Sequence, residues 1–464
     1  MESDMSILNG LSTAKLALSA QQYAMSITQR NTVNVNNPYF TRQDVFFTDP
    51  TATTNWSVHG IPGVEVFANR NRYLDQSISR ELSGLGENLV KHNALREIDA
   101  ILQATGGGGL GTSIADFFNS FTALSSNPTD SALRWQVLST AQTMVDDFQR
   151  IYNDIQRVQN TSELQIRRGL DEVNRLTAEI ASLNERLEIA IAQGKKETEF
   201  ALRDERQQYI EELQGRMDFL YFETNTGSIT ITTKQGDAVV LADRSYNLSY
   251  NSPTDINLNG VNIIPANIAS DGKAGGYISG EIGGHLDVIR MAQNYLNTLD
   301  DMARGIADAV NGIHTHTATN DAYDLDGNPG LAFFSYVSGV ADLKVEITDP
   351  RQVAAADTPQ PGNNENAKLL AALANTPISG GQTANQMYAA LVYQIGSDQR
   401  DARNAGEKQT VVLSQLLGQR NAASSVSLND EAVNLLRFQQ AYQASARFVT
   451  VLNSLSAEIL NFVR

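Results

Sequence analysis

The chain has 464 residues, 41% of them hydrophobic, which is enough for two to four domains with sizeable cores. It carries 52 acidic and 35 basic side chains, a net charge of −17, and Lys and Arg never cluster beyond a pair, which argues against nucleic-acid binding. The absence of cysteine excludes disulfides and thiolate chemistry. No apolar run reaches 18 residues, so we expect no membrane insertion. The N-terminus lacks the basic region followed by an apolar region that marks a cleavable Sec signal, so we expect no cleaved signal peptide.

The first predicted element is an amphipathic helix over residues 5–29. Apolar side chains recur at steps of four and three residues, as in the seam of a coiled coil, and include Ile7, Leu11, Leu18 and Met25. The Asn-rich stretch 31–38 ends in Pro38 and is predicted to be extended or turning. Residues 39–70 are expected to be irregular or short-stranded.

A long helical region follows. We predict helices over residues 73–104 and 198–216, with the glycine run 106–109 as a flexible break after the first. Between them, a short helix beginning near Ser113 carries phenylalanines on its inner face, and a very long helix runs from about residue 130 to about residue 193. Such a length without a strong breaker favours a helical hairpin or coiled coil.

The hydrophobic period changes near residue 217. Residues 228–233 (SITITT) alternate with period two, and residues 238–250 are strand-like, which predicts a small β domain inserted into a helical body. The helical period returns at 283–315 and, after a segment of loop and short strand at 317–363, again over 364–424.

The last predicted element is a C-terminal helix with a second seam. Its apolar positions include Leu435, Phe438, Tyr442, Val449, Leu452, Ile459 and Val463. Isolated helices of this length are marginal in water, so each stripe needs a partner, either the chain's own domain or another helix. Because both helices are terminal, where fraying is otherwise expected, we predict that they pair and form an assembly interface.

The predicted fold class is mainly α with an inserted β domain, that is, an elongated α+β multidomain chain with a long helical hairpin or coiled-coil body and paired terminal helices. We predict four parts. They are a terminal helical coiled-coil domain (1–36 with 428–464), a long-helix rod domain (37–216 with 277–320 and 364–427), an inserted β-rich outer domain (217–276), and a loop and short-strand segment that could be the remnant of a further outer domain (321–363).

Candidate chemistry is sparse. The acidic stretch 321–328 resembles a calcium loop, but with Gly327 at loop position 6 the first and last ligand positions fall on Ala322 and Phe333, so a polar turn is expected. His314 and His316 lack a third ligand nearby and are expected at the surface. We therefore predict no enzyme activity, no catalytic residues, no metal and no cofactor. A soluble metal-binding protein or enzyme using these histidines and the acidic turn is the alternative of a different class.

Two segments carry a family resemblance. Residues 31–43, NTVNVNNPYFTRQ, resemble the motif NxxNxNTPGYxRQ that follows the first helix in flagellar rod, hook and hook-associated proteins, with Asn37 and Tyr39 in place of Thr and Gly. Residues 428–447, LNDEAVNLLRFQQAYQASAR, resemble the C-terminal motif of the hook-associated branch. The motif positions that we single out are Asn31, Asn34, Asn36, Pro38, Phe40, Arg42, Gln439 and Gln440.

This resemblance implies a structural axial protein at the junction between the flagellar hook and filament. It implies self-assembly through the terminal helices into a helical homo-oligomer, with hook protein and hook-associated protein 3 as neighbours. It also implies type III export without a cleaved signal, assisted by an export chaperone. Another axial component, such as hook protein, distal rod protein or hook-associated protein 3, is the alternative within the same class.

Overall fold

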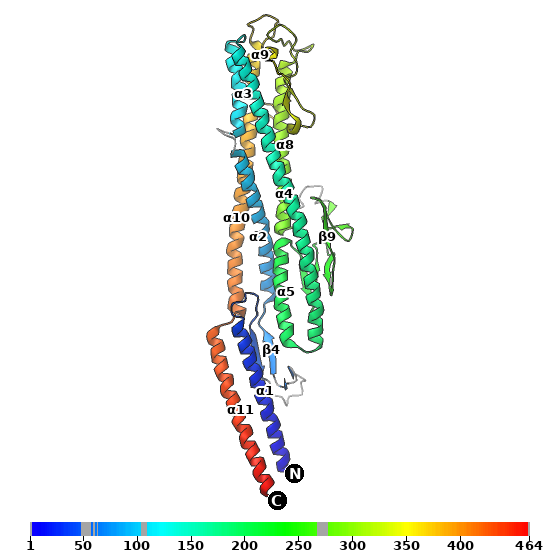
Figure 1. The fold of residues 1–464 in the computed structure, drawn as a ribbon, viewed down its shortest axis with the longest axis vertical. Helices are drawn as coiled ribbons and strands as arrows, with labels where there is room; N and C mark the ends of the chain where they lie inside the picture. Colours follow the sequence, from blue (N-terminus) through cyan, green and yellow to red (C-terminus); the bar gives the residue numbers. More distant parts are fainter. Residues whose placement is uncertain are drawn as a thin grey trace.

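The computed structural model describes residues 2–47, 57–58, 61–62, 64–103, 109–266 and 277–462. The molecule is elongated (Figure 1). The N- and C-terminal helices lie at one end of the long axis, and α3 (Gly109–Ser126) and α9 (Glu365–Ala372) lie at the other. The structure therefore has a terminal end and a distal head, joined by a rod of long helices.

The rod is built from four long helices and one that folds back. These are α2 (Arg72–Gln103), α4 (Ser131–Ala192), α8 (Gly280–His314) and α10 (Ala384–Ser424), with α5 (Lys196–Arg216) returning along α4. The 62 residues of α4 begin where the Asp130 carboxylate accepts hydrogen bonds from the Ala132 and Leu133 amides. At the start of α10, Thr383 and Gln386 form a capping box. These caps place the helix starts where the chain leaves the distal head.

An aromatic cluster forms the core of the head. Phe117 and Phe121 of α3 lie 5.3 Å apart between ring centroids in a T-shaped pair, and Phe333 and Phe334 lie 4.8 Å apart beside them. All four side chains are at most 1% exposed. Burying side chains of this size stabilises the fold by roughly 1.5–3 kcal/mol each. The short elements of the head are β12 (Phe334–Ser335), β13 (Lys344–Val345), η1 (Val340–Asp342), η2 (Pro350–Gln352) and η3 (Leu373–Asn375).

Two antiparallel sheets pack on the lower half of α4. One has the order β5 (Leu220–Glu223), β6 (Ile229–Thr232), β7 (Ala238–Leu241) and β8 (Arg244–Ser245), and the other the order β11 (Val261–Asn262), β10 (Asp255–Leu258) and β9 (Leu248–Ser252). The Asn184 amide of α4 donates to the carbonyls of Ile229 and Ala242, at 2.8 Å each, and accepts from the Ile229 amide. Asn259 and Gly260, both with positive φ, make the tight turn between β10 and β11.

The terminal end contains α1 (Glu2–Val33), α11 (Leu428–Phe462) and a β hairpin. The hairpin pairs β1 (Gln43–Phe47) with β4 (Val64–Ala68) in antiparallel register, and β2 (Ser57–Val58) pairs with β3 (Ile61–Pro62). Val64 and Val66 face α1 and form a small core with Ala20, Tyr23 and Ile27. Figure 1 shows α1 and α11 running beside each other below the rod.

The predicted fold class is confirmed, and the predicted helices agree with the structure to within a few residues at most ends. The short strands expected over residues 39–70 include β1 and β4, but their pairing across about 20 residues was not predicted. Strands β10 and β11 lie inside the segment 217–276 that was predicted to be rich in β structure, although their bounds were not predicted. The predicted glycine break at 106–109 lies largely outside the described residues. Within the described part of the chain, no helix is long and apolar enough to span a membrane.

Candidate functional site: the paired termini and their joint

The two chain ends pair as antiparallel helices. The Gln22 amide of α1 donates to the Tyr442 hydroxyl of α11 across 420 residues of sequence, at 3.3 Å. Leu452 lies against Gly10, because a Cβ built on Gly10 would be 3.3 Å from Leu452 Cδ1. The ends of the chain are therefore held side by side within one molecule (Figure 1).

The predicted interface residues fall mostly along this pair. Phe438 is buried and stacks edge-on against Phe47 of the hairpin, with ring centroids 5.9 Å apart. The half-buried members are Leu11, Leu18, Met25, Leu435, Tyr442, Val449 and Leu452. Ile7 and Ile459 lie in α1 and α11, but their side chains are outside the described part, and Val463 is outside the described residues. That these residues contact a neighbouring copy stays a prediction.

A second apolar face on α11 was missed by the sequence analysis. Its large side chains are 44–65% exposed, and we call them the outer stripe: Val433, Leu436, Phe448, Val451 and Leu455. At 100° per residue they fall within about a third of the helix circumference, opposite the seam that faces α1. Five exposed polar residues fall in the same arc, and their charges balance: Asp430, Arg437, Gln440, Arg447 and Glu458. The sequence analysis followed one series of apolar residues along the C-terminal helix, and a second series on the opposite side of the same helix was therefore not found.

The joint between the helix pair and the rod is the loop that carries the Asn-rich motif. The Asn31 side chain donates to the Gln43 carbonyl at 2.9 Å and accepts from the Gln43 amide at 3.1 Å, so one amide satisfies both backbone groups of that residue. The Asn34 side chain donates to the Arg30 carbonyl at 2.9 Å and caps the end of α1. These two asparagines fold the chain back toward the rod.

A buried carboxylate on α5 holds the end of this loop. Asp204 accepts from the Thr41 amide at 3.2 Å and from the Thr41 hydroxyl at 2.8 Å, and Arg70 Nη1 lies 3.7 Å from Asp204 Oδ1. Burial raises the pKa of Asp204 from 3.8 to about 6, opposed by the Arg70 charge and the bonds from Thr41 and aided by the charge of Asp75. The loop is therefore fixed to the rod by an acid that is costly to ionise.

The next residue ties the loop to the C-terminal half of the chain. Arg42 Nε donates to Glu431 of α11 at 2.9 Å, and Glu431 is 2% exposed. The Arg42 backbone amide donates to the Ser424 carbonyl at the end of α10, at 3.0 Å. One loop thus holds α1, α5, α10 and α11 in a fixed relation.

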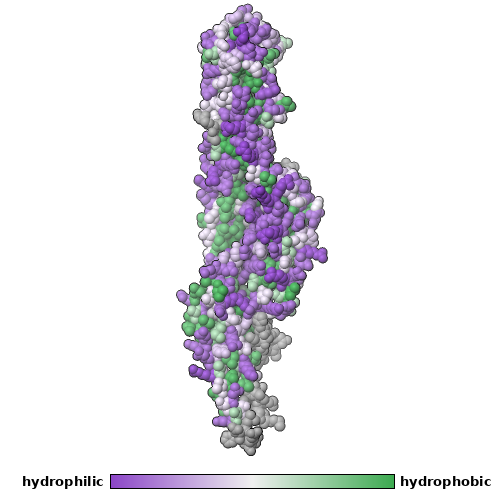
Figure 2. Space-filling model, viewed as in Figure 1, coloured by the Kyte–Doolittle hydropathy of each residue, from purple (hydrophilic) through white to green (hydrophobic). Residues whose placement is uncertain are grey.

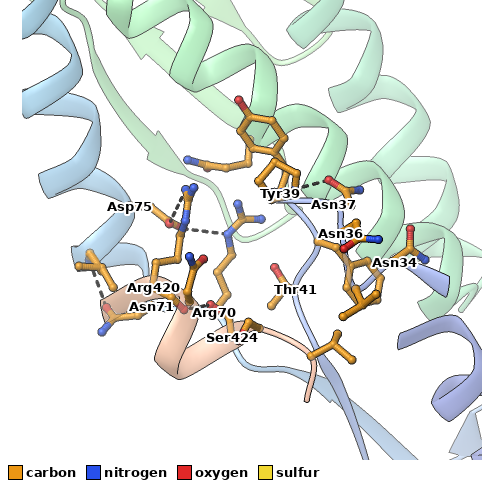
Figure 3. A pocket seen from close by; sticks show the side chains of 18 residues that line it. Asn34, Asn36, Asn37, Tyr39, Thr41, Arg70, Asn71, Asp75, Arg420 and Ser424 are labelled. Carbon is orange, nitrogen blue, oxygen red and sulfur yellow. Dashed lines mark hydrogen bonds and ion pairs between the residues drawn. The ribbon is translucent and has the colours of Figure 1, made fainter. Parts of the chain in front are cut away.

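Other motif residues line a cavity of about 350 Å³ at the joint. Figure 3 shows Arg70, Asp75 and Arg420 on one side of it and the asparagines of the loop on the other. Asn36 and Pro38 are exposed, and Phe40 is half-buried. Tyr39 replaces the motif glycine without a positive φ. Gln439 and Gln440 are placed away from the joint, on the exposed side of α11.

The β1–β4 hairpin has two different faces. Its inner face packs on α1 and on Phe200 of α5. Register places Asp44, Phe46, Glu65 and Phe67 together on the opposite side, which we call the hairpin outer face. Phe46 and Phe67 are 53% and 47% exposed and form a T-shaped pair with ring centroids 5.4 Å apart. A cavity of about 780 Å³ adjoins Phe67.

The structure corrects the expectation for one histidine. His314 is fully buried: its Nε2 accepts from the Ala354 amide at 2.8 Å, and its Nδ1 lies 2.7 Å from the Leu331 carbonyl. Burial lowers its pKa from 6.5 to about 4, so the ring is neutral and joins two loops of the head. The loops that bury this ring have no hydrophobic period, so the burial could not be predicted from the sequence pattern. Among the described residues, no three His, Cys, Asp or Glu side chains are grouped as metal ligands would be.

The long helical rod and the antiparallel pairing of the chain ends define an elongated structural subunit built mainly of helices. A family model described as "Flagellar hook-associated protein FlgK helical domain" matches residues 95–334, which is more than half of the chain. The chain belongs to this FlgK family of flagellar hook-associated proteins.

Similar proteins extend this match to nearly the whole chain. The flagellar hook-associated protein 1 of Bacillus subtilis (strain 168) is 26% identical over 501 residues and covers 97% of each chain. That of Salmonella typhimurium (strain LT2) is 23% identical over 558 residues, covering 97% of this chain and 98% of its own. The flagellar hook junction protein FlgK from Burkholderia pseudomallei has a similar fold, with a TM-score of 0.64, 13% identity and coverage of 75% of this chain and all of its own. The predicted family and flagellar axial role are confirmed.

Proposed function

We propose that this chain joins the flagellar hook to the filament and assembles on the distal hook through its terminal helices. The observation that carries this proposal is the α1–α11 pair, which holds both chain ends together and leaves an apolar stripe on the outside of α11. Exposed apolar stripes of this length are typical of surfaces that bind another protein. The names of the similar proteins support the junction as the place of assembly.

The proposal includes the partners and the four-part division of the chain. The terminal pair would form an inner tube, the rod would surround it, and the β-rich segment 217–276 would face outward. Hook protein would lie on one side of the assembled copies and hook-associated protein 3 on the other. An export chaperone and the type III apparatus would deliver the chain. A heterologous contact that does not close on itself generates such a helical array.

Deletion of the chain tests this function. Electron microscopy of the deleted strain should show hooks of normal length without filaments, and flagellin should accumulate in the medium. Missing hooks would instead place the chain in the flagellar rod or the flagellar hook. Intact filaments would contradict an axial role. A stoichiometric metal ion in the purified chain would favour the alternative of a metal-binding protein.

Two neighbouring residues of α11 provide a matched pair of variants. Leu452→Asp places a charge against Gly10 in the intramolecular pair, so it should loosen α1 from α11 and abolish incorporation at the hook. Val451→Asp changes the outer stripe, where the side chain is 54% exposed, so it should leave the helix pair intact and still prevent incorporation. Asn453→Asp, at an exposed position outside the outer stripe, is the control and should assemble normally. Normal incorporation of both stripe and seam variants would contradict assembly through these helices.

A further inference from the structure

The terminal unit, which we define as α1, α11 and the β1–β4 hairpin, is joined to the rod by two short segments. Residues 69–71 lead from the hairpin into α2, and residues 425–427 lead from α10 into α11. The Asn69 side chain donates to the Ala423 carbonyl at 2.8 Å, so the two segments lie side by side. Figure 2 shows the terminal unit below the rod and the β sheets. Two adjacent connections of this kind form a single pivot.

The contact between the terminal unit and the rod is loosely packed. Among the described residues, the core that Val64 and Val66 form with α1 includes one side chain of the rod, Phe200 of α5. Two cavities, of about 350 and 780 Å³, flank the pivot, and Thr41 and Asp75 line both of them. Protein interiors are close-packed, so cavities of this size leave room for movement. Domains that lack a large apolar interface are expected to move relative to each other.

An ion pair connects the terminal unit to the rod at a distance from the pivot. Arg30 in the last turn of α1 pairs with Glu197 in the first turn of α5, and these side chains are 25% and 30% exposed. Burial raises the pKa of the Tyr23 hydroxyl, and the charge of Glu197 raises it further, so Glu197 lies close to α1 at a second position. Glu197 precedes Asp204, which holds Thr41 beside the pivot, by about 10 Å along the helix.

We propose that the terminal unit pivots on the rod about residues 69–71 and 425–427, and that the Arg30–Glu197 pair is a latch that holds one tilt. Protein hinges are a few residues in loops or at the ends of elements, as these two segments are. Because the pair lies about 10 Å from the pivot, separating its atoms by a further 3 Å or so needs a tilt of about 15°. The 35 residues of α11 span about 52 Å, so its far end would move by about 14 Å.

The latch should respond to salt more strongly than the contacts at the pivot. Arg30 and Glu197 are both partly exposed, so added salt screens their attraction. Asp204, by contrast, is 7% exposed and holds Thr41 by hydrogen bonds. An exposed ion pair changes an equilibrium by roughly 1.5- to 5-fold, so the tilted population should rise by that factor when the pair is screened or removed. This inference concerns the single chain and does not depend on the proposed place of assembly.

Distances between spin labels measure the tilt of the complete chain in solution. The chain contains no cysteine, so labels attach only at introduced cysteines. Gln193→Cys at the tip of the α4–α5 hairpin and Ser454→Cys on α11, both at exposed positions, place labels on either side of the joint. Opening of the latch should lengthen their separation. A second pair, Gln29→Cys with Gln439→Cys, lies within the terminal unit and is the control.

Raising the salt concentration from about 50 mM to about 500 mM should increase the fraction of long separations by roughly 1.5- to 5-fold, while the control pair keeps one distance. Glu197→Gln should show the larger fraction already at low salt and should lose the salt dependence. Glu205→Gln removes the same charge from an exposed position of α5 and should behave as the wild-type chain does. Arg30→Glu combined with Glu197→Arg should restore the shorter separation, because a side chain with only a packing role would not be rescued by the exchange.

Two results overturn the inference. If neither salt nor Glu197→Gln changes the fraction of long separations, the ion pair does not hold the tilt. If the control pair broadens to the same extent, the terminal unit unfolds and does not pivot. The helical circular-dichroism signal of each variant distinguishes a change of tilt from loss of the fold. The salt titration of the chain with native Arg30 and Glu197 tests the latch even if a variant fails to fold.

Discussion

Asp204 should stabilise the folded chain more as the pH falls. Burial raises the pKa of Asp204 from 3.8 to about 6, so between these values the folded chain binds a proton that the unfolded chain has released. A carboxyl group with a raised pKa favours the folded state below pH 3.8, and this advantage is lost as the pH rises through 6. At 1.4 kcal/mol per pKa unit, the difference between pH 3.5 and pH 7 is roughly 3 kcal/mol.

Asp204→Asn should remove this dependence. The asparagine oxygen can accept from the Thr41 amide, and its NH₂ group can donate to the Thr41 hydroxyl, so both bonds at 3.2 and 2.8 Å keep a partner. The variant resembles the protonated acid and loses only the attraction to Arg70. Because asparagine carries no charge to bury, we expect the stability of this variant to change little between neutral and acid pH.

Hydrogen exchange of the slowest amides of α5, which exchange when the rod unfolds, measures the effect. After correction for the intrinsic exchange rate, protection in the wild-type chain should rise by about 50- to 100-fold between pH 7 and pH 4, while Asp204→Asn should change little. Thr41→Val, which removes only the hydroxyl, is the matched control and should lose protection at every pH. The reasoning is refuted if wild-type protection falls on acidification, because the folded chain would then favour the ionised carboxylate.

Two further predictions concern the head and the rod. The folded pKa of about 4 for His314 lies below its ordinary 6.5, so the unfolded chain binds the extra proton, and the head should lose roughly 3 kcal/mol of stability as the pH falls from 6.5 to 4. Hydrogen exchange at the Ala354 amide, which donates to His314 Nε2, would show this loss, and equal protection at both pH values would contradict it. In α8, Gly284→Ala places a Cβ 2.7 Å from the Glu87 carbonyl and should destabilise the rod by roughly 1–3 kcal/mol, whereas Gly312→Ala meets nothing within 4 Å and should stabilise it by about 0.5–1 kcal/mol. Thermal unfolding of the two variants should shift in opposite directions, and a shift of the same sign would rule out the close α2–α8 approach as the cause.

The helices were predictable because their apolar side chains repeat along a continuous segment. α4 is the clearest case, since its buried positions follow one another at helical spacing from Val137 to Leu187. The terminal pairing was predictable for the same reason, because the seams on α1 and α11 each need a partner. Periodicity, however, gives faces of a helix and does not say what covers each face. The exposed Val451 and the half-buried Leu452 are both apolar neighbours, and only the position of α1 distinguishes them.

The joint could not be predicted from local pattern. Asp204 and Thr41 are 163 residues apart, and Arg42 and Glu431 are 389 residues apart. Nothing near Asp204 in the sequence distinguishes it from the solvated carboxylates on the same helix. The asparagines of residues 31–37 were recognised only through their resemblance to a family motif, and the structure supplies their physical role in closing the turn after α1. The buried His314 was missed because its partners lie in irregular loops.

The length of α4 gives the joint a mechanical importance. At 1.5 Å per residue its 62 residues span about 93 Å, from the distal head to the level of the joint (Figure 1). A small tilt at the joint is therefore amplified along the rod: if α4 tilted by about 5° at Thr41, the head would move by about 8 Å. Interfaces pack as densely as protein interiors, so a displacement of that size would separate any contact that the head makes. The few hydrogen bonds around Thr41 and Arg42 thus limit the tilt of the rod relative to the terminal helices, and so they limit the displacement of the head.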